Sequence, residues 1–121
     1  MHDKQVLDET QIRAALSGEL AQWSLRDTHL ERRFETGGWR TSLMVANAIG
    51  LLAEQAWHHP DLIVTFPAVV VRVQSHDVGG ITGRDLELAR RIEALVLWRP
   101  EPGASALSGL PAGEPSLRLP S

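Results

Sequence analysis

Cysteine is absent from the 121 residues of this sequence, and tyrosine is absent as well. Without cysteine there is no disulfide framework, no thiol nucleophile and no zinc site with thiolate ligands. No apolar run approaches the roughly 20 residues that a membrane-spanning helix needs, and the first four residues begin no signal-peptide core. The sequence therefore predicts a cytoplasmic protein that does not enter a membrane.

The sequence also has little excess of charge of either sign, with a formal net charge of −3 at pH 7. A nucleic-acid partner is not indicated, since proteins that bind nucleic acids carry a basic patch or stripe. What the chain does contain is ordinary for a globular protein, with 43% hydrophobic and 22% charged residues. A chain of this length predicts a single domain.

Composition divides the chain into two parts. Residues 1–99 hold the periodic patterns, whereas residues 100–121 are rich in proline, glycine, serine and alanine and show no periodicity. We expect a folded domain over 1–99 and a flexible C-terminal tail over 100–121. The tail also carries four leucines that could dock elsewhere, namely Leu107, Leu110, Leu117 and Leu119.

Apolar periodicity predicts three helices and four strands. The helices are expected over residues 8–20, 39–58 and 82–97, and the strands over 22–26, 29–36, 62–66 and 68–75. Pro60 is expected to stop the second helix, and Thr82 with Asp85 has the form of a capping box at the start of the third. This order predicts an α+β fold, a four-stranded antiparallel sheet with three helices packed on one face (α-β-β-α-β-β-α).

The direction of side chains follows from the same periods. Leu30 and Phe34 should share a strand face with Arg32 between them, and Val69, Val71 and Val73 should share another. In the last helix, the expected apolar stripe consists of Leu88, Ile92 and Leu95. Glu93 is expected to face outward.

The 39–58 helix is apolar over most of its surface, which indicates burial on more than one side. One side is expected to face the sheet and another a second subunit, so we predict self-association into a dimer or tetramer. Tryptophan is the main aromatic residue, and most of its copies are interpreted as core or interface anchors. The four copies are Trp23, Trp39, Trp57 and Trp98.

Three histidines fall at the ends of expected elements. His58 and His59 end the long helix, and His76 follows the last strand. Histidine is the side chain best suited to proton transfer near neutral pH. A dehydration needs one group to protonate the departing hydroxyl and another to remove a proton from the neighbouring atom. These histidines form a candidate acid–base site in which the assignment of acid and base stays open, whereas His29 suggests no role.

One set of spaced residues resembles the signature of the pterin-4a-carbinolamine dehydratases. The set is Glu54, His58, His59, Pro60, Phe66, His76 and Asp85. The resemblance extends from about residue 7 to residue 97. It implies dehydration of 4a-hydroxytetrahydropterin to the quinonoid dihydropterin by subunits that dimerise and often form tetramers. Acid–base dehydration by histidines requires no cofactor.

The resemblance also implies a role for each polar residue of the set. His58 and His76 would transfer protons as catalytic residues, and Asp85 and Glu54 would orient or tune the histidines. His59 would hold the pterin, with Glu54 as its companion in substrate binding. The pterin would lie in a cleft between the long helix and the loop at His76.

Each of these residues also has a purely structural interpretation. Asp85 completes a capping box, and His58 and His59 complement the dipole at a helix C-terminus. Glu54 is then a solvated helix position, and His76 caps a strand. A metal site is not expected, because adjacent helix residues point about 100° apart and no fourth ligand has a suitable spacing.

A second prediction of function comes from one branch of the same family. Proteins of this branch are associated with α-carboxysomes and serve as RuBisCO assembly factors. The segments that resemble it are the 56–62 segment with Trp57 before the histidine pair, the apolar 43–45 and 80–82 segments, and the 97–98 ending with its tail. The alternative is therefore a non-enzymatic, carboxysome-associated protein whose partner is RuBisCO.

Overall fold

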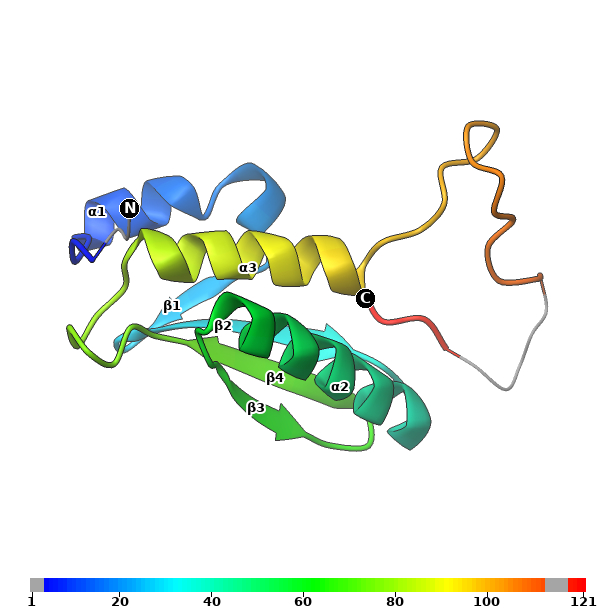
Figure 1. Cartoon of the computed structure of the whole chain (residues 1–121), viewed down its shortest axis with the longest axis horizontal. Helices are drawn as coiled ribbons and strands as arrows, with labels where there is room; N and C mark the ends of the chain where they lie inside the picture. The colour runs from blue at the N-terminus through cyan, green and yellow to red at the C-terminus, as the bar shows by residue number, and fades with distance from the viewer. Residues whose placement is uncertain (1–3, 113–117) are drawn as a thin grey trace.

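Helices and strand pairs alternate along the chain in this computed structural model, which describes residues 4–112 and 118–121. The helices are α1 (Glu9–Ala15), α2 (Trp39–Ala56) and α3 (Gly83–Val96), with a 3-10 turn, η1 (Gly18–Leu20), after α1. The strands are β1 (Ser24–Arg26), β2 (His29–Glu35), β3 (Asp61–Val64) and β4 (Ala68–Val73). All pairings are antiparallel in the order β1-β2-β4-β3, and the helices cover one face of the sheet (Figure 1). The predicted α+β fold is confirmed.

The core lies between this sheet face and the helices. Alternate residues of β2 and β4 meet across the ladder in three pairs, Leu30 with Val73, Arg32 with Val71, and Phe34 with Val69. All six are buried, as the alternation predicts. Ile49 of α2 and Ile92 of α3 close the layer from above, each fully buried. Burial of each large apolar side chain contributes roughly 1.5–3 kcal/mol.

Glu93 of α3 turns inward, so the expectation that it faces outward is wrong. Its carboxylate accepts hydrogen bonds from Nε and Nη2 of Arg32 at 2.9 and 3.1 Å and from Nε1 of Trp23 at 2.8 Å. Both donors are buried and need an acceptor, which outweighs the solvation of one carboxylate. The apolar stripe of α3 continues to Val96, whereas Leu95, which was expected inside, is 45% exposed.

Two helix boundaries also differ from the prediction. The expected 8–20 helix divides into α1 and η1, with Gly18 at φ +68°. The long helix ends at Ala56, two residues before the expected end at His58, because Trp57 takes the left-handed conformation (φ 51°, ψ 47°). Pro60 therefore follows a helix that has already ended.

Only part of the tryptophan prediction is tested by a single chain. Trp23 is buried in the core, as expected, whereas Trp39, Trp57 and Trp98 are 50%, 77% and 57% exposed. Leu43, Met44 and Leu51 of α2 are exposed as well. Burial of these side chains against a second subunit stays a prediction. Although α2 shows apolar side chains to the outside, no helix in the described part of the chain is long and apolar enough to cross a membrane.

The end of the chain returns to the domain. The backbone N–H and C=O of Ser121 pair with the C=O and N–H of Glu35 at 2.9 and 2.8 Å. The hydroxyl of Thr41 donates to the carbonyl of Arg118 at 2.9 Å. Residues 118–121 thus lie beside the end of β2 and the first turn of α2. The division at residue 99 and the flexibility of the tail stay predictions.

Replacing Glu93 with alanine should lower the free energy of unfolding by about 3–5 kcal/mol, because the buried guanidinium of Arg32 loses its carboxylate. Urea denaturation followed by tryptophan fluorescence measures the loss. The matched control is Glu87→Ala on the same helix, whose exposed pair with Arg91 predicts a change within about 0.5 kcal/mol. Equal losses in the two variants would contradict the role assigned to the buried pair.

Candidate active site

The turn that ends α2 sets the direction of the two adjacent histidines. The N–H of Trp57 donates to the carbonyl of Glu54 at 3.2 Å, and the N–H of His58 donates to the carbonyl of Ala53 at 3.1 Å. This pair of bonds around a left-handed residue is the Schellman pattern. It carries His58 and His59 off the helix axis, and their rings then point to different partners.

Asp85 is the partner of His58. This carboxylate is fully buried, and its Oδ1 lies 2.7 Å from Nε2 of His58. Its Oδ2 accepts the hydroxyl of Ser75 at 2.6 Å and the backbone N–H of Thr82 at 2.8 Å. One carboxylate therefore joins the end of α2, the segment after β4 and the start of α3. The predicted capping box is confirmed, and the same carboxylate also contacts a predicted catalytic histidine.

This contact constrains the tautomer of His58. An ionised carboxylate only accepts hydrogen bonds, so Nε2 of His58 must carry the proton of the bond to Asp85. In the neutral ring, Nδ1 then has the lone pair and is the basic atom. The side chain of His58 is 15% exposed, so it is sheltered and still open to a cavity.

His59 forms a second histidine–carboxylate pair, on the outside of the molecule. Its Nε2 lies 2.6 Å from Oε1 of Glu54, one turn back on α2. Its ring also meets the indole of Trp57 edge to face, with centroids 4.9 Å apart and planes at 82°. The two residues that the resemblance assigns to substrate binding are thus in direct contact.

His76 lies apart from these two pairs. Its side chain is exposed, and its ring centroid is 6.4 Å from that of His29. His76 is not among the residues that line the cavity around His58. Its backbone is nevertheless tied to the site, since the preceding residue, Ser75, donates to Asp85. The turn after His76 closes by a bridge between Ser75 and Gly80.

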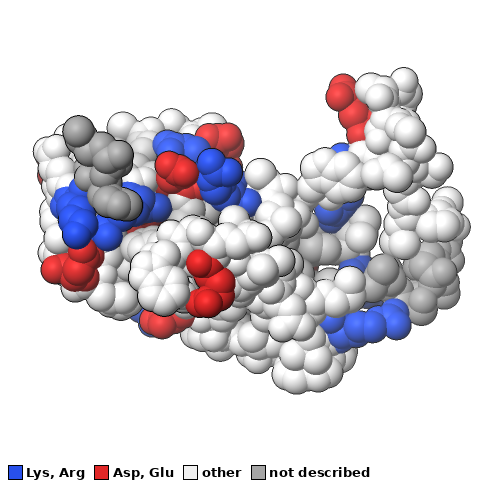
Figure 2. Space-filling view, viewed as in Figure 1, with Lys and Arg blue, Asp and Glu red and all other residues white. Residues whose placement is uncertain are grey.

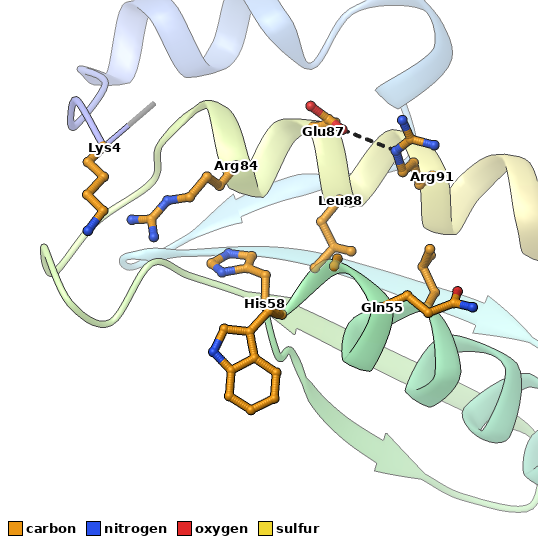
Figure 3. Close-up of a pocket in the computed structure, with 10 residues that line it drawn as sticks. Lys4, Gln55, His58, Arg84, Glu87, Leu88 and Arg91 are labelled. Atoms are coloured by element: carbon orange, nitrogen blue, oxygen red, sulfur yellow. Dashed lines mark hydrogen bonds and ion pairs between the residues drawn. The ribbon is translucent and has the colours of Figure 1, made fainter. Parts of the chain in front are cut away.

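A cavity of about 640 Å³ opens between the end of α2 and the first half of α3. Its volume falls in the range of small-molecule sites. Its lining residues are Lys4, Leu52, Gln55, Ala56, Trp57, His58, Arg84, Glu87, Leu88 and Arg91. In Figure 3 the side chains of Lys4, Arg84 and His58 point into the same space. Of the predicted site residues, His58 is the one that lines this cavity.

Charged groups gather at the cavity end that lies near the N-terminus. Arg84 donates from Nη2 to Oδ1 of Asp77 at 2.9 Å, and Nζ of Lys4 lies 3.7 Å from Oδ2 of Asp77. The hydrogen bond from Arg84 lowers the pKa of Asp77 below its ordinary value of 3.8. Figure 2 shows the basic and acidic side chains crowded at this end of the molecule, whereas the surface over α2 is largely uncharged.

Sequence reasoning assigned no role in the site to Ser75, Lys4 or Arg84. Ser75 precedes His76, and Arg84 lies inside the capping box, so their closeness to the site has a local signal. The sequence gives no local signal for Lys4. Its position depends on a hydrogen bond from the backbone N–H of Leu7 to the carbonyl of Ile81 (2.8 Å), which brings the N-terminal segment beside the start of α3. Such a distant pairing leaves no pattern in the sequence.

Comparison with known proteins gives one consistent result. A family model described as "Pterin 4 alpha carbinolamine dehydratase" matches residues 5–95. A protein of Aquifex aeolicus named "Putative pterin-4-alpha-carbinolamine dehydratase" is 42% identical over 90 residues, which cover 74% of this chain and 90% of that protein. A protein of Sulfolobus acidocaldarius with the same name is 35% identical over 89 residues, 74% of this chain and 97% of that protein. The crystal structure of a "transcriptional coactivator/pterin dehydratase" from Brucella melitensis is similar with a TM-score of 0.69 and 27% identity, and covers 75% of this chain and 98% of that one.

The pair between Arg84 and Asp77 should make part of the stability depend on acid pH. The folded-state pKa of Asp77 is lowered, so the contribution is complete above the ordinary pKa of 3.8 and is lost as pH falls through the lower folded value. Asp77→Asn removes the titrating group. The wild-type midpoint of thermal unfolding should exceed that of the variant at pH 6, and the difference should shrink as pH falls below about 3.9. A difference that stays constant over this pH range would contradict the assignment.

Proposed function

The chain belongs to the pterin-4a-carbinolamine dehydratase family, and we propose that it catalyses the dehydration of 4a-hydroxytetrahydropterin to quinonoid dihydropterin. The observation that carries this proposal is the position of His58. Its ring lines a cavity of about 640 Å³, and its Nε2 is held by the buried carboxylate of Asp85. A sheltered, oriented imidazole beside a cavity of this size suits proton transfer on a small flat substrate.

The reaction breaks the C–O bond at carbon 4a and forms a double bond from this carbon to the adjacent ring nitrogen. The nitrogen loses its proton, and the hydroxyl receives a proton and leaves as water, so electrons balance without an oxidant. His58 is proposed as the base that takes the nitrogen proton through Nδ1. Asp85 then stabilises the imidazolium that forms, because its carboxylate already faces Nε2 at 2.7 Å.

His76 is proposed as the acid that protonates the departing hydroxyl. It is exposed, and its loop is anchored through Ser75 to the same Asp85 that orients His58. His59 and Glu54 are proposed to hold the pterin, since their 2.6 Å contact fixes the imidazole at the turn before Pro60. This arrangement requires the exposed His76 ring to approach the cavity when substrate binds, because catalytic contacts often tighten only in the complex.

His58→Ala should reduce kcat/KM for quinonoid dihydropterin formation by about 10²–10⁴-fold, the usual contribution of a general acid–base group. A stopped-flow absorbance assay on the purified chain measures it. Asp85→Asn should also reduce the rate and shift the pH profile, because the one amide oxygen keeps the capping bonds of α3, the amide nitrogen cannot accept the proton of Nε2, and no charge is left to stabilise an imidazolium. Circular dichroism confirms that the variants fold. A folded wild-type protein without dehydratase activity would rule out the proposal.

A second candidate function is supported by exposed apolar side chains. Trp57, Ile63 and Phe66 are 77%, 49% and 62% exposed, and exposed apolar surface marks candidate interaction sites. We propose as the alternative a RuBisCO assembly factor associated with α-carboxysomes, because these exposed side chains accompany the segments at 43–45, 56–62, 80–82 and 97–98 that resemble that branch. Alongside this alternative, the exposed residues of α2 support self-association.

Co-expression with the RuBisCO subunits tests this alternative. The wild-type chain should raise the yield of soluble, assembled RuBisCO, and the double variant Ile63→Lys, Phe66→Asp should abolish the gain because charge replaces the apolar contact surface. Glu101→Gln, a change in the exposed segment after α3, is the control and should keep the gain. An unchanged RuBisCO yield with the wild-type chain would contradict the assembly role.

A further inference from the structure

Trp57 occupies a conformation that its side chain disfavours. It ends α2 with φ 51° and ψ 47°, in the left-handed region where helices usually place glycine or asparagine. A residue with a Cβ is strained there, and a bulky one is unusual enough to suggest a function. Nothing in the turn itself requires an indole, because the two bonds of the Schellman pattern come from the backbone.

The indole of Trp57 also contributes little to the core. It is 77% exposed, the largest exposed fraction among the exposed large hydrophobic residues that the structure describes. The strained backbone disfavours the folded state of the isolated chain, and the exposed ring offsets little of that cost because it removes little apolar area from water. A glycine at this position would remove the strain. The residue therefore has a use that folding does not explain.

The surroundings of Trp57 indicate that use. Its side chain lines the cavity of about 640 Å³ beside His58. It also contacts the ring of His59 edge to face at 4.9 Å, and His59 in turn contacts Glu54. The indole thus contacts one histidine of the site and borders the cavity that the other lines.

We propose that Trp57 is a substrate-binding residue whose indole stacks against the flat heterocycle of the pterin and so determines specificity for planar ring systems. This inference rests on the proposed dehydratase function and adds a residue to it. Offset stacking of two aromatic rings is favourable beyond the apolar area that it buries. It also orients the ring plane, which leaves the polar edge of the heterocycle to the histidines.

The test compares Trp57→Gly with the wild-type chain in two measurements. Equilibrium binding of 7,8-dihydrobiopterin should weaken about tenfold, because stacking and its buried area are lost. The urea midpoint should stay equal or rise, since glycine suits the left-handed position. In the dehydratase assay KM should rise with little change in kcat, as expected for contacts made equally in the ground and transition states. Trp57→Phe should restore most of the affinity, and Trp98→Phe, which changes an exposed tryptophan outside the cavity lining, is the control.

The possible outcomes separate this inference from the proposed function. If the wild-type chain binds no pterin, the dehydratase proposal fails and this inference fails with it. If wild type and Trp57→Gly bind the pterin equally well, only the stacking role is refuted. A lower urea midpoint in Trp57→Gly would assign the indole a structural role and would also refute it. Weaker pterin binding with an unchanged or higher midpoint supports it.

Discussion

The buried carboxylate of Asp85 is the group on which the rest of the site depends. A buried charge is unfavourable unless donors surround it, and here the donors come from three parts of the chain: the end of α2, the segment after β4 and the start of α3. The fold must bring these parts together to stabilise the carboxylate. The same convergence orients His58 toward the cavity, so stability and the candidate chemistry share one group.

The parts of the fold that follow from local patterns were predictable. Alternation in β2 and β4 placed Leu30, Phe34 and the valines inward, because strand faces repeat every second residue. The capping box of α3 was also predictable from a local pattern, because its two partners are three residues apart in the sequence. Glu93 was not, because the buried donors that draw it inward, Arg32 and Trp23, are 61 and 70 residues away.

Prediction of the site from the sequence has the same limit, since contacts between distant residues leave no local pattern. The sequence identified the residue types of the site, and the structure brings two pairs into contact, His58 with Asp85 and His59 with Glu54. The direction of each ring depends on how α2 ends, and the sequence pattern placed that end at His58, two residues beyond the observed end at Ala56. A left-handed Trp57 has no sequence signal, since the residue type itself disfavours it. The place of His76 outside the cavity lining depends on a loop whose shape no local pattern fixes.

The last four residues lie at the other end of the same helix. The family model matches residues 5–95, whereas residues 118–121 lie against Glu35 and Thr41, at the end of β2 and the first turn of α2. The cavity begins at Leu52 of α2, 11 residues after Thr41, a helix length of roughly 16 Å. Four residues anchored at the first turn do not reach the cavity in this arrangement. A role of these residues in stability or partner binding would therefore be separable, by truncation, from the acid–base chemistry at His58.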